Sequence, residues 1–161
     1  MARHPGTFKP AILLVDADGD TRELHRMLLD DVACTIEEAC DGVEAYGRAL
    51  SHPPDVVVTE MRLPRMDGRT LIERLRNDSR LHACGILVVS GSAHAMAIDD
   101  LLRVGADDVL VKPCEPEVLV RAVERVSRRV PRPPGSLVSA RSDMGTALED
   151  GEPFRARRHR A

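Results

Sequence analysis

Short apolar runs alternate along the chain with segments in which apolar residues recur every three or four positions. The runs have the length of strands, and the three-to-four spacing is typical of amphipathic helices. Strands are predicted at 11–15, 34–39, 55–59, 85–90 and 108–111. Five helices are marked by Leu24, Met27 and Leu28; Val43, Tyr46 and Leu50; Leu71, Ile72 and Leu75; Ala97, Ile98, Leu101 and Leu102; and Val118, Leu119, Ala122, Val123 and Val126.

Strand–helix alternation with short connections predicts a parallel sheet covered by helices on both faces. Three runs, 11–15, 55–59 and 85–90, are almost wholly apolar and fit its centre, whereas the more polar 34–39 fits an edge. Because crossover connections are right-handed, the expected fold class is α/β, a doubly wound five-stranded parallel sandwich. Asp20 and Glu23 form the expected cap pair of the first helix.

The composition divides the chain into three parts. Residues 9–130 carry the alternating pattern and form the predicted domain, and residues 1–8 are a short N-terminal extension. Residues 131–161 contain four prolines, three glycines and six arginines against four acids, with no sustained apolar period. Such a composition predicts a disordered tail, and its basic end is interpreted as a solvated segment.

Overall charge and apolar content exclude several classes of protein. The net charge of −3 gives no electrostatic reason to bind nucleic acid or an anionic membrane. No apolar run approaches the roughly 20 residues that span a bilayer, and the N-terminus lacks a signal-peptide pattern. We therefore expect a cytoplasmic protein. Its cysteines, Cys34, Cys40, Cys84 and Cys114, show no C-x-x-C spacing and are expected to be reduced rather than metal ligands.

Polar side chains stand where four of the predicted strands end. They are Asp16, Glu60, Ser90 and Lys112, at the ends of the first, third, fourth and fifth strands. Parallel strands bring their carboxyl ends to one edge, where ligands bind in sheets of this kind. Carboxylates, a hydroxyl and a lysine are the groups that a site for phosphoryl transfer uses.

Residues 9–129 resemble the receiver domain of bacterial two-component response regulators. The resemblance rests on five motifs in order: AILLVDAD, ACDGVEA, PDVVVTEMRLPRMDG, ILVVSGSA and GADDVLVKP. It implies a flavodoxin-like (βα)5 fold and a signalling module rather than an enzyme. In the family a histidine kinase passes phosphate to an aspartate that ends the third strand, and magnesium is held by acids that end the first.

Three positions depart from the family pattern. Glu60 stands in place of the phosphoacceptor aspartate, Ala17 in place of the second acid of the first strand, and Val109 in place of the aromatic switch residue. Ser90 and Lys112 match the pattern. Val109 is interpreted as a packed strand residue.

The changed residues predict a pocket in which magnesium binding is weak or absent. Asp16, Glu60 and Lys112 sum to −1, whereas a standard receiver pocket carries about −2. Magnesium requires near-octahedral oxygen ligands, so no cofactor is expected, and any weak binding would use Asp16, Glu60 and the backbone of Arg62. Glu60 reaches one methylene further than aspartate, far enough to contact Lys112 and Ser90. The hypothesis is a degenerate receiver held in one conformation by a Glu60–Lys112 pair, with the Arg62 side chain exposed.

The resemblance places partner binding on residues 94–129, where Arg121, Arg125 and Arg128 form a basic stripe on the last helix. The expected function is a stand-alone receiver that acts through a protein partner, either a histidine kinase or a downstream effector. No helix-turn-helix pattern follows the domain, so direct DNA binding is not expected.

Several alternatives stay open. The receiver could still be phosphorylated, slowly on Glu60 or on Asp16 or Asp18, or Glu60 could belong to an inactive, solvated site. LLVDADGDT also resembles the first motif of haloacid-dehalogenase-type phosphohydrolases, with Asp16 as nucleophile and Asp18 as general acid. Asp20 breaks that family's D-G-T, and its acidic pair is absent after Lys112. The spacing of DADGD does not fit a calcium loop, nor does it fit a flavodoxin-type phosphate cradle.

Overall fold

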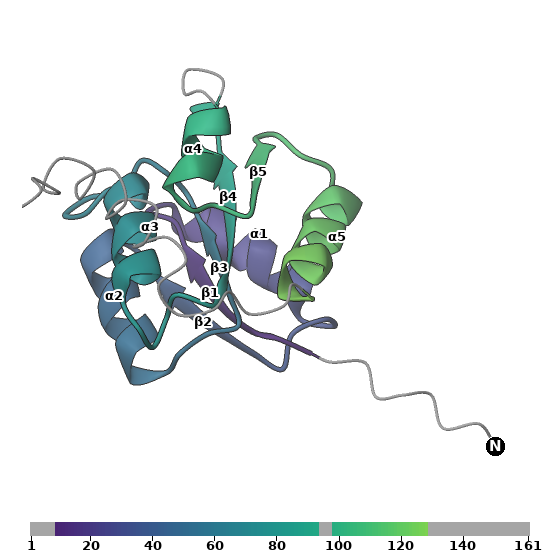
Figure 1. The fold of residues 1–161 in the computed structure, drawn as a ribbon. Helices are drawn as coiled ribbons and strands as arrows, with labels where there is room; N and C mark the ends of the chain where they lie inside the picture. The colour runs from purple at the N-terminus through teal and green to yellow at the C-terminus, as the bar shows by residue number, and fades with distance from the viewer. Residues whose placement is uncertain (1–8, 94–97, 129–161) are drawn as a thin grey trace, which may run out of the picture.

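The computed structural model describes residues 9–93 and 98–128. Strands and helices alternate strictly along the chain (Figure 1). The strands are β1 (Ala11–Val15), β2 (Thr35–Ala39), β3 (Val56–Thr59), β4 (Gly85–Ser90) and β5 (Asp108–Val111); the helices are α1 (Gly19–Leu29), α2 (Gly42–Ser51), α3 (Gly68–Asn77), α4 (Ile98–Val104) and α5 (Pro116–Ser127). All ten elements lie where the apolar pattern predicts them. The proposed extension and tail fall outside the described residues, so both remain predictions.

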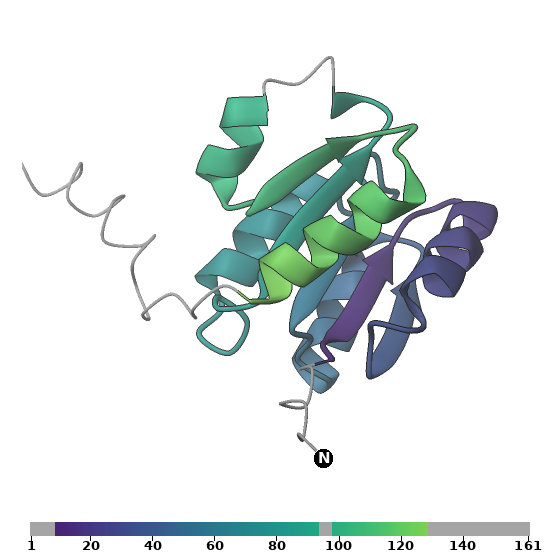
Figure 2. The same cartoon turned by 90° about the vertical axis from the view of Figure 1, so that its right-hand side faces the viewer.

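All five strands are parallel and follow the order β2-β1-β3-β4-β5. The apolar strands β1, β3 and β4 occupy the centre, and the polar β2 is an edge strand, as predicted. Helices α2, α3 and α4 cover one face of the sheet, and α1 and α5 cover the other (Figures 1 and 2). The doubly wound α/β sandwich is confirmed. Among the described residues no helix is long and apolar enough to cross a bilayer.

Aliphatic side chains fill both layers between the sheet and its helices. On one side Leu71, Ile72 and Leu75 of α3 are fully buried against the sheet. On the other side Leu119 and Val123 of α5 pack against the opposite strand faces. The sheet is therefore apolar on both faces, and its polar groups gather at the strand ends.

The first helix departs from the sequence prediction in two ways. Leu24 and Met27, two of the apolar positions that mark this helix in the sequence, are 54% and 71% exposed, and Leu29 is the residue that α1 buries. The helix also begins earlier than predicted, because Asp18 is its N-cap and accepts a hydrogen bond from the Asp20 N–H. The expected Asp20–Glu23 cap pair is wrong. Residues are spaced by 100° around a helix, so a small shift in register exchanges buried for exposed positions.

A buried ion pair joins α3 to the turn that precedes β5. The Arg76 guanidinium is 4% exposed and lies 2.8 Å from the Asp107 carboxylate, just before β5. It also donates hydrogen bonds to the backbone oxygens of Gly105, His82 and Cys84. Asp107 accepts a further bond from the Ile86 N–H. This network joins the turns before β4 and β5 to α3.

Removal of this guanidinium is expected to destabilise the domain. Arg76→Met leaves a buried carboxylate without its cation and should lower the free energy of unfolding by about 3–5 kcal/mol, measured by urea denaturation. Arg74→Met is the control, because the exposed Arg74 stacks on Tyr46 at 5.8 Å and its loss should cost about 1 kcal/mol or less. Equal stabilities for the two variants would contradict the assignment.

Candidate functional site

The register of the sheet brings the predicted polar residues to one edge. Ser90 ends β4, and the other three continue a backbone hydrogen-bond ladder by one step beyond their strands. The Asp16 N–H donates to Ala39 O at 3.2 Å, the Glu60 N–H to Val15 O at 2.9 Å, and the Lys112 N–H to Ser90 O at 3.0 Å. Residues far apart in sequence are therefore neighbours because their strands pair in parallel.

The loop after β3 is held by two close contacts of glycine. Asp67 caps α3 by accepting a bond from the Thr70 N–H at 2.8 Å. Gly68 begins α3 so close to the Glu60 backbone that a Cβ there would lie 2.5 Å from Glu60 O. At Gly42, the start of α2, a Cβ would lie 2.0 Å from Met66 O. The two glycines fix the loop and with it the direction of Glu60.

The Glu60 carboxylate is enclosed by hydrogen-bond donors. Its Oε1 accepts a bond from the Ser90 hydroxyl and another from the Met61 N–H at 2.6 Å. Its Oε2 faces the Gly91 N–H at 3.4 Å. Its side chain is only 12% exposed. Glu60 is therefore not solvated at the end of its strand but is bound to the start of the loop that follows β4.

The Lys112 ammonium joins the two acids. Its Nζ lies 2.7 Å from Asp16 Oδ2 and 3.2 Å from Glu60 Oε2. The other oxygen of Asp16 accepts a bond from the Asp18 N–H at 2.9 Å. All four carboxylate oxygens of the pair therefore already contact a donor or a cation. The Lys112–Pro113 peptide bond that follows is cis.

The contacts of this pocket shift the pKa values of its charged groups. Burial by itself raises the pKa of Glu60, but the bonds from Ser90, the Met61 N–H and Lys112 outweigh it and hold that pKa below its usual value. Burial opposes the charge on Lys112, yet Asp16 and Glu60 together raise the pKa of the ammonium. Both partners are thus ionised at neutral pH.

The structure describes the two residues at the degenerate positions, Ala17 and Val109, and two further residues near them, Asp18 and Arg62. Ala17 is exposed in the loop after β1 and offers only a methyl group. Val109 packs against the core on the α4 side of the sheet. Arg62 is exposed. Asp18 is occupied as the cap of α1, where it accepts a bond from the Thr21 hydroxyl at 2.7 Å, so it is not turned toward Glu60.

Two residues of the site were missed by the sequence analysis. The Ser92 hydroxyl lies 3.0 Å from that of Ser90 and extends the hydrogen-bonded chain from Glu60. Arg22 reaches back from α1 and donates to Asp16 O at 2.6 Å. Ser92 follows Ser90 by two positions in a loop, and this spacing was a signal that could have suggested a contact. Nothing in the apolar pattern indicated Arg22.

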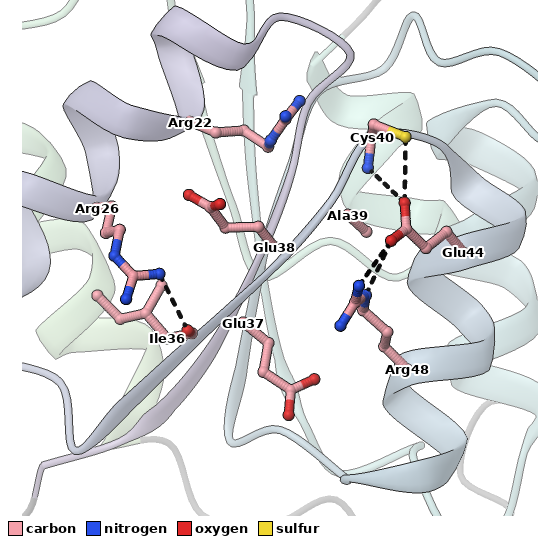
Figure 3. Close-up of a pocket in the computed structure, with 9 residues that line it drawn as sticks. All are labelled: Arg22, Arg26, Ile36, Glu37, Glu38, Ala39, Cys40, Glu44 and Arg48. Atoms are coloured by element: carbon pink, nitrogen blue, oxygen red, sulfur yellow. Dashed lines mark hydrogen bonds and ion pairs between the residues drawn. The ribbon is translucent and has the colours of Figure 1, made fainter.

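A second cluster of possible metal ligands lies beside the edge strand. Ligand atoms of Cys40, Asp41 and Glu44 are within 4.8 Å of one another. Figure 3 shows Glu44 bonded to Cys40 on one side and to Arg48 on the other. These contacts lower the pKa of Glu44 to about 2. Asp41 is the cap of α2, so the cluster is accounted for by local structure. All four cysteines are free thiols.

Comparison with known proteins identifies the family. The family model of the response regulator receiver domain matches residues 12–124, so the chain belongs to this family. It is 30% identical over 125 residues to the DNA-binding dual master transcriptional regulator RpaA of Synechocystis sp., covering 78% of this chain and 52% of that regulator. It is 32% identical over 114 residues to a 14.6 kDa protein of Leptolyngbya boryana, covering 71% of this chain and 87% of that protein.

Solved structures agree with this assignment. A two-component response regulator from Clostridium difficile superposes with a TM-score of 0.68 at 30% identity, covering 75% of this chain and 98% of that one. The chain spans about half the length of RpaA. The family and its receiver fold are therefore established.

The ionised Glu60 is expected to stabilise the fold in a pH-dependent way. Because its pKa is lower in the folded state, its contribution is present above its ordinary value of 4.5 and is lost as the pH falls through the folded value. The stability difference between wild type and Glu60→Gln should therefore shrink on acidification from about pH 6 to about pH 3, as measured by urea denaturation. Glu23→Gln, at an exposed position on α1, is the control. A difference that stays constant over this range would contradict the role of the carboxylate.

Proposed function

We propose that this protein is a receiver module of two-component signalling that acts by protein–protein contact without phosphorylation at the usual position. Glu60 stands in the phosphoacceptor's place and is held by Lys112 and Ser90. The observation that carries the proposal is the binding of one carboxylate at the same time by the Ser90 hydroxyl, the Met61 N–H and the Lys112 ammonium. A carboxylate that is already saturated with donors is a poor nucleophile, because attack requires a free lone pair.

The chemistry of the ligand set supports an expected absence of magnesium. The cation would need several oxygen ligands in near-octahedral order. Position 17 supplies none, and the oxygens of Asp16 and Glu60 are shared with Lys112. The backbone of Arg62, the third expected ligand, lies beside the same carboxylate, with its N–H 3.4 Å from Glu60 Oε1. These residues do not fit the metal.

The surface made by α4, β5 and α5 suits a protein partner. Apolar side chains are exposed there, namely Ile98 and Leu102 on α4 and Val118 on α5. Exposed apolar groups with a polar rim are typical of interaction surfaces. Of the basic stripe, Arg121 is exposed, whereas Arg125 is paired with Asp108 of β5. Residues 94–97 and 129 of the proposed 94–129 surface lie outside the described residues.

Neither enzyme chemistry nor orthodox phosphorylation is favoured. The phosphohydrolase alternative needs Asp16 as a free nucleophile and Asp18 as an acid, yet Asp16 is paired with Lys112 and Asp18 caps α1. Family membership also favours a signalling module. Phosphorylation by a histidine kinase remains the second candidate, because Ser90 and Lys112 keep the family pattern.

Treatment with a small-molecule phosphodonor tests whether Glu60 accepts a phosphoryl group. Wild type with acetyl phosphate and magnesium should show no mass increase of a phosphoryl group, because Glu60 is occupied and position 17 gives no ligand. The double variant Ala17→Asp/Glu60→Asp should accept label under the same conditions. Stoichiometric, acid-labile label on wild type that is lost in Glu60→Gln would overturn the proposal. If the label is lost only in Asp16→Asn or Asp18→Asn, that aspartate is the acceptor. Magnesium-dependent phosphatase activity that is lost in Asp16→Asn would instead support the phosphohydrolase alternative.

Partner capture tests whether the conformation held by Glu60 matters. A protein retained by wild-type bait should be lost with Glu60→Ala and with Leu102→Ser on α4. Leu24→Ser is the control, because Leu24 is equally apolar and exposed but lies on α1. Undiminished capture by Glu60→Ala would favour an inactive site in which the glutamate has no function.

A further inference from the structure

The edge strand β2 carries backbone groups that point away from the sheet. The Asp16 N–H donates to Ala39 O, so the carbonyl of Ala39 points toward β1. Successive residues of a strand direct their N–H and carbonyl groups to opposite sides, so those of Ile36 and Glu38 point outward. An outward row of this kind is a template on which a further strand can pair.

A hollow of about 430 Å³ lies along this edge, between side chains of α1 and α2 (Figure 3). Two of these side chains reach the outward backbone. Arg26 donates to Ile36 O at 3.5 Å, the outer limit of a hydrogen bond, and Glu44 accepts a bond from the Cys40 N–H at 3.0 Å. The edge is therefore closed firmly only at Cys40, and a further strand has room along β2 up to that residue.

The handedness of crossover connections directs the chain that follows α5 to this edge. Helix α1 joins β1 to β2 over the face of the sheet that α5 also covers (Figures 1 and 2). With the strand order β2-β1-β3-β4-β5, a chain that passes from β5 through α5 to the outer side of β2 crosses in the same direction as the β1–α1–β2 unit. Such a crossover is right-handed, whereas a strand added beyond β5 would need a left-handed one.

The end of α5 also lies close to the start of β2. Arg128 lines the same small hollow as Asp31 and Val32, which belong to the turn before β2. The seven residues 129–135 span up to about 23 Å when extended. That length is enough to lead from this hollow to the outer side of the strand.

One segment of the chain after α5, SLVSAR at 136–141, has a composition that fits this edge. It is short and partly apolar, it carries no acid, and it follows two prolines and a glycine. A parallel register that sets Leu137 beside Ile36 brings together the apolar residues of the two strands. The same register places Arg141 diagonally across from Glu38, where opposite charges attract.

A second copy of the chain fits the edge less well. Two β2 strands related by a two-fold axis would run antiparallel and bring the acids Glu37 and Glu38 close to the same acids of the other copy. Like charges across a strand pair are unfavourable. The charge of the edge therefore favours the segment with arginine over a second β2.

We propose that residues 136–141 bind the outer edge of β2 as a sixth parallel strand, with Leu137 beside Ile36. The added strand fills the hollow and closes the edge against pairing with other chains. For this segment alone, the proposal replaces the expectation of a disordered tail. It uses no contact of Glu60, so it goes beyond the proposed function and does not depend on it.

Two proline variants of the full chain test the pairing. In this register the Val138 N–H donates to Ile36 O, whereas the Ser139 N–H points away from β2. Val138→Pro therefore removes a hydrogen bond of the ladder, and Ser139→Pro removes none. By NMR the Glu38 amide should exchange with solvent at least about tenfold faster in Val138→Pro than in wild type. Ser139→Pro should resemble wild type, and the Glu37 amide, which faces β1, is the internal reference.

Three outcomes would overturn the inference. Equal exchange of the Glu38 amide in wild type and both variants would show that the segment does not protect the edge. An equal loss of protection in Val138→Pro and Ser139→Pro would show that the alternation expected of a strand is absent. Protection that grows with protein concentration, together with a dimer in sedimentation, would assign the edge to a second copy. Protection that is independent of concentration and is lost only in Val138→Pro would support the sixth strand.

Discussion

The contact on which the pocket depends is the Lys112 ammonium between the carboxylates of Asp16 and Glu60. The two acids end neighbouring strands, and their side chains are 10% and 12% exposed. Two such groups at one sheltered edge repel each other, and the ammonium between them offsets this repulsion. Lys112 reaches both from the end of β5. It thereby ties together three strands, β1, β3 and β5, that do not all pair with one another.

The Glu60 carboxylate joins the groups at this edge in a closed set of contacts. From its position the carboxylate bonds to Ser90 and lies near the Gly91 N–H, so the chain leaving β4 toward α4 is anchored on β3. Ser92 continues the same chain of hydroxyls. Here the connection is part of the unmodified polypeptide.

Sequence patterning predicted the architecture because strands are short and the sheet is apolar on both faces. Once β1, β3 and β4 are parallel neighbours, Asp16, Glu60 and Ser90 must meet at one edge, and this could be argued without coordinates. The buried face of α1 could not be predicted from the sequence, because Leu24 and Met27 are apolar but solvent-exposed, whereas Leu29 is buried. Apolar identity alone does not distinguish an exposed leucine from a buried one. The helix also starts at a different residue from the one that the expected cap pair indicated, which changes the face that is buried.

The positions of long polar side chains also could not be predicted from the sequence. Arg22 and Arg26 look alike in sequence, and only the backbone of the loop after β1 decides which of them contacts the site. The Arg76 guanidinium is likewise buried although arginine is usually exposed, because Asp107 and three backbone oxygens satisfy it. Such placements depend on distances between loops, which periodicity does not encode.

Gly42 shows how far the constraint on the pocket extends. Its Cα lies so near Met66 O that position 42 is closed to every residue that carries a side chain. Met66 belongs to the loop whose first residue is Glu60, so a larger residue at the start of α2 would push this loop outward and swing the glutamate from its partners. Because position 42 admits only glycine, α2 helps to hold the pocket in its arrangement, although this helix contributes no group to the pocket.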